Sequence, residues 1–507
     1  MALNLEESNI QRFYKSSTVF LTGATGFIGK LLLEKILRAL PVNKVYILVR
    51  SKKDVPGAKR LLNLFQSPVF DLLKRSNASL LEKVSIMDGD LSQPILGLSK
   101  ENQQTIIDEV DVIFHCAATV RFDEHLKKAT TINIKGTKEL IDLAKKITKL
   151  KTFMYMGTAF SNSYQKEIEE KIYPTKITAE NLISMCNSLD EEYLDVLAKS
   201  LTAGWPNTYT FTKQVIEDYI QREATELPIC ICRPSIVLST ASEPVESFTD
   251  NVFSLGGLSV LGGLGISRIM YFRNIDTQII PADFVVNECI AAGWLTGENF
   301  IKKQFTNIPV YNITNGRDNP INQSYIFEKM YSEIRRNFAT KKMIAYPMVF
   351  STKFKYNYLI WRFFLHTMIG YFFDLIRKIQ GKKPRFVAAM KKLNTFQDAY
   401  IFFLTTEFLM DTRNTANLLK KMSCKDKKLF NFDVKTLDWE SYFTEYVKGL
   451  RFYLLKESID TLPEGRRHND YLKKVMIAVV FLSIFLVYVV GKILLFRLIP
   501  LVFGLLA

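Results

Sequence analysis

The segment TGATGFIG, residues 22–29, constrains the fold of this 507-residue chain more than any other stretch. It follows the strand-like run STVFL and leads into the helical pattern FIGKLLLEKILRAL. Gly23 permits a sharp turn from strand to helix, Gly26 lets a phosphate approach the backbone, and Gly29 lets the helix pack closely on the strand. In this setting the glycines predict a dinucleotide-binding turn. The cofactor contacts expected from it are Gly23, Thr25, Gly26, Phe27, Ile28 and Gly29.

Strand-like apolar segments alternate with helical patterns through the first 325 residues. After the first strand they are KVYILVR, KVSIMDGD, DVIFHCAA, TFMYMGT, LPICICRPSIV and PVYNITNG. Alternation of this kind specifies a parallel sheet covered by helices on both faces. We therefore predict an α/β fold with a doubly wound parallel Rossmann-type sheet over residues 15–325. Helical spacing then dominates residues 326–465, which predicts a mainly α-helical C-terminal domain.

The end of the second predicted strand indicates which dinucleotide binds. This strand ends in Arg50, 21 residues after Gly29, and Lys52 and Lys53 follow. An acidic residue at this place would bind the ribose 2′-hydroxyl of NAD, whereas a cation matches the 2′-phosphate of NADP. A solvated charge run is the alternative, but the spacing favours NADPH as the cofactor. Further expected cofactor contacts are Asp90 and Leu91 at the adenine edge, Ala117 and Ala118 along the cofactor, and Pro234.

The segment NTYTFTK contains Tyr209 and Lys213, four residues apart and therefore on one face of a helix. An ammonium near a phenol lowers the tyrosine pKa from about 10 toward working pH. Tyr209 could then donate a proton to an oxygen that gains negative charge, and Lys213 could also hold the nicotinamide ribose. A chance surface pair is the alternative, but the position of the pair after a dinucleotide-binding half-fold favours a catalytic role.

The C-terminus is apolar. Residues 475–491 carry no charge, and apolar sequence continues to the chain end around Lys492 and Arg497. Seventeen helical residues reach about 25 Å, at the short end of a membrane span. We predict a membrane anchor over residues 475–507, which crosses once or turns back near Pro500. Basic residues before the span favour a cytosolic catalytic portion, and the endoplasmic reticulum is the expected membrane, with the peroxisome as the alternative.

Charge and composition narrow the partners and cofactors further. The net charge is +16, which suits a phosphate-bearing substrate or an anionic membrane surface; without a basic arm or zinc-finger spacing, no nucleic-acid partner is expected. Four scattered histidines predict no metal site, and His115 is expected to be a core residue. Asn133 either takes part in catalysis or packs between helices. The aromatic residues 357–373 are expected to pack in the core, with an acyl-tunnel wall or a membrane-interface face as alternatives.

Several longer segments resemble the fatty acyl-CoA reductases, a family of extended short-chain dehydrogenase/reductases. They are TGATGFIGKLLLEKILR, CAATVRFDEHLKKATTINIKGT, YTFTK, CRPSIV, YNITNGRDNPI and, downstream, DKKLFNFDVKTLDWESYFTEYVKGLRFYLLKE. The resemblance covers nearly all of residues 15–460. It implies NADPH-dependent reduction of long-chain fatty acyl-CoA to a primary alcohol through a bound aldehyde, with release of CoA. It also implies that Tyr209 donates protons, that Lys213 tunes Tyr209, and that Arg121, Lys127 and Lys128 could meet the CoA phosphates.

One departure from the family pattern lies at the end of the fifth predicted strand. Relatives commonly read V-S-T-A-Y, whereas this chain reads M-G-T-A-F, with Gly157 and Phe160 in place of serine and tyrosine. The catalytic hydroxyl of the family aligns best with Thr158, so the resemblance implies that the Thr158 hydroxyl holds the oxyanion. A reductase of sterols or other lipid carbonyls and a non-catalytic lipid-binding relative are the alternative functions.

Overall fold

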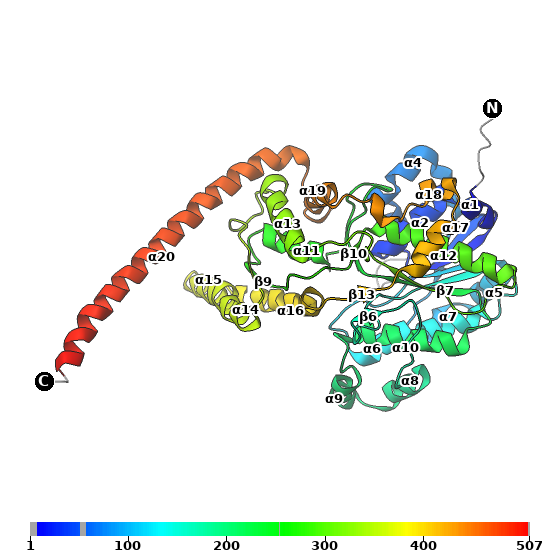
Figure 1. The fold of residues 1–507 in the computed structure, drawn as a ribbon, viewed down its shortest axis with the longest axis horizontal. Coiled ribbons are helices and arrows are strands. Elements are labelled where there is room, and N and C mark those ends of the chain that lie inside the picture. The colour runs from blue at the N-terminus through cyan, green and yellow to red at the C-terminus, as the bar shows by residue number, and fades with distance from the viewer. Residues whose placement is uncertain (1–7, 51–56, 253, 505–507) are drawn as a thin grey trace.

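A computed structural model describes residues 8–50, 57–252 and 254–504; Lys52 and Lys53 lie outside these ranges. Seven parallel strands form the central sheet in the order β11-β7-β5-β4-β1-β2-β3 (Figure 1). The strands, in chain order, are β1 (Thr18–Thr22), β2 (Lys44–Val49), β3 (Val84–Asp88), β4 (Val112–His115), β5 (Thr152–Met156), β7 (Ile229–Pro234) and β11 (Val310–Ile313). The strand order reverses direction between β1 and β4, and at such a point the carboxyl ends of the strands leave a crevice for a ligand.

Helices cover both faces of the sheet, which confirms the predicted doubly wound fold. One face packs against α2 (Phe27–Ala39) and α12 (Ala282–Ile301). The other packs against α5 (Lys100–Glu109), α7 (Gly136–Ala144) and α10 (Thr208–Glu223). Smaller helices on this part of the chain include α1 (Asn9–Phe13), α3 (Gly57–Phe65), α4 (Asp71–Asn77), α6 (Leu126–Ala129), α8 (Ala179–Ser188), α9 (Glu191–Leu201) and α11 (Leu255–Gly263).

The region after β11 is mainly helical, as predicted. It contains α13 (Gln323–Asn337), α14 (Lys355–Arg362), a π-helical turn over Phe363–Met368, α15 (Ile369–Ile379), α16 (Phe386–Thr405), α17 (Arg413–Lys421), α18 (Cys424–Leu429) and α19 (Trp439–Gly449). Short parallel pairings tie it to the first region: β12 (Phe350–Thr352) pairs with β9 (Ile269–Tyr271), and β13 (Leu409–Met410) pairs with β6 (Glu167–Ile168).

Two short helices of the C-terminal region return to the sheet. Leu418 of α17 and Phe430, just after α18, are buried in the same core as α2 and α12. Asp426 of α18 accepts a hydrogen bond from the hydroxyl of Ser8 at 2.5 Å. The helices after residue 410 therefore complete the cover of the dinucleotide-binding sheet.

The last helix, α20, runs without a break from Leu462 to Gly504 and projects from the body of the molecule (Figure 1). A helix of this length reaches about 65 Å. It passes through Pro500, so the described residues show no turn back at this proline. Two stretches are long and apolar enough to cross a membrane, Ile459–Lys492 with mean hydropathy 2.5 and Lys355–Ile379 with mean hydropathy 1.3.

The second stretch corrects one sequence prediction. Residues 357–373 were expected to pack in the core, but most of their large apolar side chains are exposed: Trp361 is 50% exposed and Phe372 is 60% exposed. A narrow stripe that includes Tyr358, His366 and Gly370 is buried. The apolar composition of this segment therefore does not reflect burial inside the protein.

Candidate active site

A cavity of about 680 Å³ opens at the carboxyl ends of the strands, beside the reversal between β1 and β4. Residues from the β1–α2 turn, from the ends of β4 and β5, from α10 and from α16 surround it. The structure brings all the predicted site residues to this one cavity: Gly23, Thr25, Gly26, Phe27, Ile28, Gly29, Arg50, Asp90, Leu91, Ala117, Ala118, Thr158, Tyr209, Lys213 and Pro234.

The glycine-rich turn is shaped for close contacts. Gly23 has φ +80°, and a Cβ on it would lie 2.7 Å from the backbone nitrogen of Ala117; a Cβ on Gly29 would lie 2.1 Å from the carbonyl oxygen of Gly23. Helix α2 starts after Gly26 with no side-chain cap, so its first N–H groups face the cavity unshielded. Such a helix N-terminus binds a phosphate through its N–H groups and its dipole. These residues fit the pyrophosphate of a dinucleotide.

Two arginines line this cavity next to Asp90. Arg50 faces Asp90, with Nη1 3.6 Å from Oδ2, and both side chains line the cavity. Arg60, which the sequence analysis missed, donates to the carbonyl oxygen of Arg50 and lies 3.5 Å from the hydroxyl of Thr25. Burial lowers the pKa of Arg60, and the nearby Arg50 lowers it further. This part of the cavity therefore presents two guanidinium groups to a ligand.

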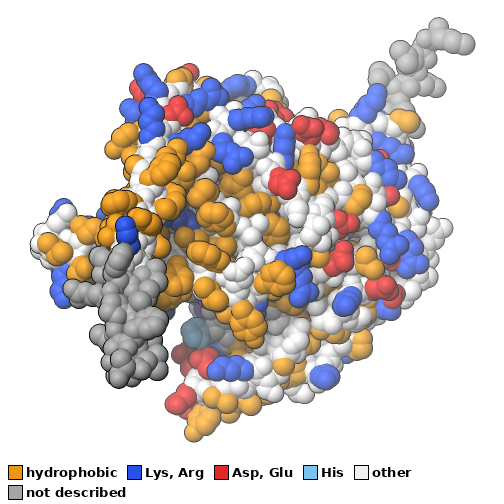
Figure 2. Space-filling model, turned by 60° about the vertical axis from the view of Figure 1, so that its left-hand side comes forward, with side chains coloured by type: hydrophobic (Ala, Val, Ile, Leu, Met, Phe, Trp, Pro, Cys, Tyr) orange, Lys and Arg blue, Asp and Glu red, His pale blue; other side chains and the backbone are white. Residues whose placement is uncertain are grey.

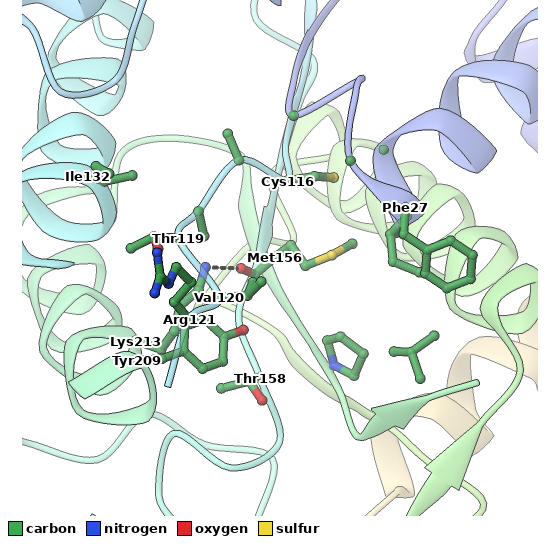
Figure 3. Close-up of a pocket in the computed structure, with 18 of the residues that line it drawn as sticks. Phe27, Cys116, Thr119, Val120, Arg121, Ile132, Met156, Thr158, Tyr209 and Lys213 are labelled. Carbon is green, nitrogen blue, oxygen red and sulfur yellow. Dashed lines mark hydrogen bonds between the residues drawn. The ribbon is translucent and has the colours of Figure 1, made fainter. Parts of the chain in front are cut away.

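The side chains of Tyr209 and Thr158 line the same cavity. Figure 3 shows both, with Lys213, on the side opposite Phe27 of the glycine turn. Burial raises the pKa of Tyr209 well above its usual value, a hydrogen bond with Thr158 lowers it in part, and the Glu217 carboxylate raises it. The Thr158 oxygen also accepts a hydrogen bond from the backbone N–H of Phe160 at 3.3 Å. The phenol and the threonine hydroxyl thus belong to one cavity.

Lys213 has different partners from those expected. Its Nζ donates to the carbonyl oxygen of Met156 at 2.6 Å and to the hydroxyl of Tyr155 at 3.2 Å, as Figure 3 shows for Met156. Burial lowers the pKa of Lys213 to about 8, while Glu217 opposes this shift. The ammonium is thus directed to the end of β5, and the expected tuning of the Tyr209 pKa by Lys213 stays a prediction.

Gly157 lines the cavity between Met156 and Thr158. A Cβ on it would lie 2.5 Å from Oε1 of Glu217 and 3.3 Å from Cγ of Arg233. Successive residues of an extended chain point to opposite faces, so Thr158 faces the cavity while position 157 faces the buried ion pair of Glu217 and Arg233. A serine at 157 would contact this ion pair. The glycine therefore leaves the hydroxyl of Thr158 in place.

Two polar residues near the cavity have structural partners. The Asn133 amide oxygen accepts from the backbone N–H of Thr119 at 2.9 Å, and its nitrogen donates to the Thr212 hydroxyl at 3.0 Å, which ties the loop after β4 to α10. His115 is buried between the hydroxyls of Thr22 and Thr137, at 2.6 and 2.9 Å. Burial lowers the pKa of His115 to about 3, with a smaller effect of Lys213. The core role expected for His115 is confirmed.

The apolar wall beside Tyr209 was not found from the sequence. The ring of Phe122 stacks on Tyr209 at 6.3 Å, and the rings of Tyr400 and Phe403 lie 5.7 and 5.6 Å from Phe122. Tyr400 and Phe403 belong to α16, so the C-terminal region forms part of the cavity. No pattern in the sequence marks these aromatic residues, because core and ligand-facing aromatics look alike.

Two of the three basic residues that the sequence analysis proposed for the CoA phosphates lie at the cavity. Arg121 and Lys128 line the cavity, whereas Lys127 is absent from its wall. Arg121 pairs with Asp123 at 3.2 Å and Lys128 pairs with Glu124 at 3.0 Å, and both cations are largely exposed. Within residues 8–50, 57–252 and 254–504, no three His, Cys, Asp or Glu side chains lie together as metal ligands would.

Comparison with known proteins agrees with this geometry. Models described as male sterility protein match residues 21–289 and 365–457. The chain is 36% identical over 470 residues to the fatty acyl-CoA reductase wat of Drosophila melanogaster, with 92% of this chain and 90% of that protein covered. The chain belongs to the fatty acyl-CoA reductase family. Fatty acyl-CoA reductase 1 of Homo sapiens is similar at 34% identity over 469 residues, with the same shares of the two chains covered.

Solved structures support the fold. The reductase domain of a non-ribosomal peptide synthetase from Mycobacterium tuberculosis superposes with a TM-score of 0.56 at 20% identity, covering 88% of this chain and 96% of that one. The terminal R domain of the myxalamid biosynthetic pathway has a TM-score of 0.55 at 19% identity, covering 86% of this chain and 90% of that one. As a member of the fatty acyl-CoA reductase family, this protein is an oxidoreductase with a nicotinamide-dinucleotide domain.

Proposed function

We propose that this member of the fatty acyl-CoA reductase family reduces long-chain fatty acyl-CoA to the primary alcohol with two NADPH, releasing CoA and holding the aldehyde between the two reductions. The observation that carries the proposal is that the Tyr209 and Thr158 side chains line the same cavity as the glycine turn. The names of the relatives supply the substrate class.

The roles of the residues follow from their positions. When bound, NADPH supplies the hydride that reduces the carbonyl carbon. Thr158 donates a hydrogen bond to the carbonyl oxygen as it gains negative charge, and Tyr209 delivers the proton to it in the aldehyde step. In the thioester step the same two hydroxyls stabilise the oxyanion until the thiolate of CoA leaves. Lys213, fixed by Met156 and Tyr155, positions the ribose beside them.

The preference for NADPH rests on the two guanidinium groups. Arg50 and Arg60 line the same end of the cavity, and planar guanidinium groups bind phosphate oxygens through paired hydrogen bonds. The ion pair of Arg50 with Asp90, at 3.6 Å, is longer than a direct hydrogen bond. A 2′-phosphate can therefore approach Arg50 without breaking a tight contact.

A second, apolar cavity of about 70 Å³ suits the end of the acyl chain. Its wall includes Leu258 of α11, Met330 and Tyr331 of α13, and Phe443 of α19. On three elements, one residue lines the active-site cavity and the next one lines this apolar cavity. The three pairs are Val237 and Leu238, Ser254 and Leu255, and Phe403 and Leu404.

Aromatic residues continue the path between the two cavities. Phe122, which stacks on Tyr209, belongs to the same apolar cluster as Leu258 and Phe272. The ring of Phe272 lies 5.1 Å from that of Phe327, on the wall of the second cavity. An acyl chain placed along these side chains would leave its carbonyl next to the Tyr209 hydroxyl, and burial of each methylene contributes about 0.8 kcal/mol to binding.

We also propose that α20 anchors the protein in a membrane with the catalytic part in the cytosol. The exposed apolar side chains over residues 475–490 and the lysines at 473 and 474 support this orientation. The unbroken course of α20 past Pro500 supports a single crossing. The endoplasmic reticulum remains the expected location, with the peroxisome as the alternative.

The purified full-length protein with palmitoyl-CoA and NADPH tests the proposal. We expect hexadecanol, free CoA and two NADPH consumed for each alcohol formed. Accumulation of free aldehyde with one NADPH consumed would show that the protein carries out only a two-electron reduction, which stops at the aldehyde. No NADPH consumption with acyl-CoA, or turnover of a sterol ketone instead, would refute the assignment.

A further inference from the structure

α14, the π-helical turn and α15 form one helix over residues 355–379. Its polar side chains face the protein, and most of its large apolar side chains face outward. Its inner stripe contains Tyr358, Arg362, His366, Gly370 and Asp374 at four-residue spacing, and four of these five residues are polar; Arg362 and Asp374 are half-buried and the other three are buried. A helix that faces water shows the opposite pattern, with polar side chains outward. Polar side chains turned toward a neighbouring helix, with apolar ones outward, are typical of helices in contact with lipid.

The inner stripe has a specific partner in α16. The Tyr358 hydroxyl contacts Gln397 at 3.3 Å, and His366 Nδ1 lies 2.9 Å from the Asn394 amide oxygen. Arg362 pairs with Asp398 at 2.5 Å. These contacts fix the rotation of the helix, so the outward direction of its apolar side chains is set by structure.

Asp374 closes the same helical pair at its far end. Its carboxylate accepts hydrogen bonds from the backbone N–H groups of Arg385, Phe386 and Val387, at 2.7, 2.8 and 2.9 Å. It thereby caps the N-terminus of α16. The two helices form a hairpin, which we call the aromatic hairpin, residues 355–405.

The outer face of the aromatic hairpin is broad and apolar. Figure 2 shows hydrophobic side chains gathered beside the C-terminal helix, and Figure 1 shows α14, α15 and α20 at the same end of the molecule, away from the sheet. Tyrosine and tryptophan, which favour the boundary between water and lipid, occur along it. The exposed large apolar residues are Tyr356, Leu359, Ile360, Trp361, Phe363, Phe364, Met368, Tyr371, Phe372, Phe373, Leu375 and Ile379.

Cations surround this apolar face. Residues 353–392 contain nine Lys or Arg residues besides Arg362, which pairs inward with Asp398, and one acidic residue, Asp374, which is occupied by its three backbone donors. Lys378, Lys382, Lys383 and Arg385 lie close together at the tip of the hairpin and are exposed. Clustered cations next to an apolar face match anionic lipid headgroups above acyl chains.

We propose that the aromatic hairpin is a second membrane contact, which lies in the plane of an anionic bilayer surface with its outer face among the upper acyl chains. Insertion across the bilayer would require the cations at the tip to cross the apolar core, at high cost. The exposed apolar length of α20 lies at the same end of the molecule (Figure 1), so both are assigned to one bilayer. The hairpin then orients the catalytic body, which α20 alone would leave free to rotate.

The orientation has a consequence for the active site. Helix α16 starts at the tip of the hairpin, on the lipid-facing side, and carries Tyr400 and Phe403 into the active-site cavity. Seventeen residues separate Phe386 from Phe403, a helical rise of about 26 Å. The docked hairpin thus holds the acyl-chain side of the cavity near the membrane that contains the lipid substrate and product.

Tryptophan fluorescence of the full-length protein tests the proposal. Trp361 lies on the outer face of the hairpin, while the other three tryptophans, Trp205, Trp294 and Trp439, lie elsewhere in the fold. The protein is reconstituted into phosphatidylserine-containing vesicles with phosphatidylcholine brominated near the headgroup end of its chains. We expect emission to fall by about a quarter, since one of four tryptophans contacts the bromines. The variant Trp361→Phe should lose this quenching, and the matched control Trp439→Phe should keep it.

Two further measurements decide between occupants of the face. Bromines near the end of the acyl chains should quench less; stronger quenching there would indicate a spanning helix and overturn the in-plane proposal. A variant with Phe364→Glu and Phe372→Glu, both exposed positions, should lose at least half of the quenching. Equal quenching in wild-type and Trp361→Phe proteins would overturn the proposal. So would unquenched Trp361 together with cross-linking of a Phe364→Cys variant to a second copy, which would assign the face to self-association.

Discussion

The buried ion pair behind the active site gives a prediction with a definite magnitude. Arg233 and Glu217 are 0% and 1% exposed in their side chains and approach to 2.7 Å. The Glu217 carboxylate also accepts from Ser161 at 3.2 Å. Replacing Glu217 by glutamine leaves the Arg233 guanidinium buried without a counter-charge, which costs about 3–5 kcal/mol. We therefore expect Glu217→Gln to lower the free energy of unfolding by this amount.

The same substitution has an effect on catalysis with a known sign. Lys213, with a pKa of about 8, is charged below this pH and neutral above it, and Glu217 favours its charged form. Removing the carboxylate lowers the Lys213 pKa further. The fall in kcat/KM with rising pH, expected near pH 8 in the wild-type protein, should therefore move to lower pH in Glu217→Gln. In Lys213→Arg, whose side chain does not titrate in this range, the fall should disappear.

Urea unfolding of the detergent-solubilised full-length protein, together with pH profiles of kcat/KM, provides the assay. The double variant Glu217→Leu with Arg233→Met is the control, because replacing both charges by apolar side chains is often neutral or stabilising. It should recover stability while keeping the shifted pH profile. A Glu217→Gln protein within about 1 kcal/mol of wild type would refute the reasoning, since the guanidinium would then have another source of compensation.

Four further predictions concern the cavity itself. Tyr209→Phe should lower kcat by about 10²–10⁴-fold with NADPH affinity, measured by fluorescence titration, unchanged; weak cofactor binding would contradict the assigned proton-donor role. Thr158→Ala should lower kcat by about 10²-fold or more, and Thr158→Ser should restore most of it; full activity of the alanine variant would move the oxyanion contact elsewhere. Arg50→Glu or Arg60→Glu should shift the ratio of kcat/KM values from NADPH toward NADH, and an unchanged ratio would remove the argument from the 2′-phosphate. Met330→Phe should fill the apolar cavity and shift the product profile toward shorter acyl chains, whereas activity with short chains should persist; loss at all lengths would count against that cavity.

The sequence was sufficient to predict the dinucleotide-binding part. Each predicted strand of the central sheet is present, because alternating apolar strands and helices leave few alternatives to a covered parallel sheet. The positions of Gly23 and Tyr209 on one cavity also followed from the sequence, since carboxyl ends of parallel strands meet at one edge. The catalytic and cofactor roles of these residues stay predictions, as does the division of the chain at residue 325.

Contacts between distant segments were not predictable. The direction of the Lys213 ammonium depends on Met156 and Tyr155, which belong to another strand. The wall formed by Tyr400 and Phe403 depends on how α16 packs. Residues 357–373 were misassigned to the core because composition measures how apolar a segment is and gives no information on whether protein or another medium surrounds it.

The return of α17 and α18 to the sheet affects how the chain is made. Leu418 and Phe430 complete the core around α2, and Asp426 holds Ser8 near the start of the chain. While a ribosome is still translating the first 400 residues, the nucleotide-binding half has an uncovered apolar surface. Its maturation therefore awaits α17 and α18, which lie between α16 and α19 in the last fifth of the chain, so the catalytic body is completed only near the end of synthesis.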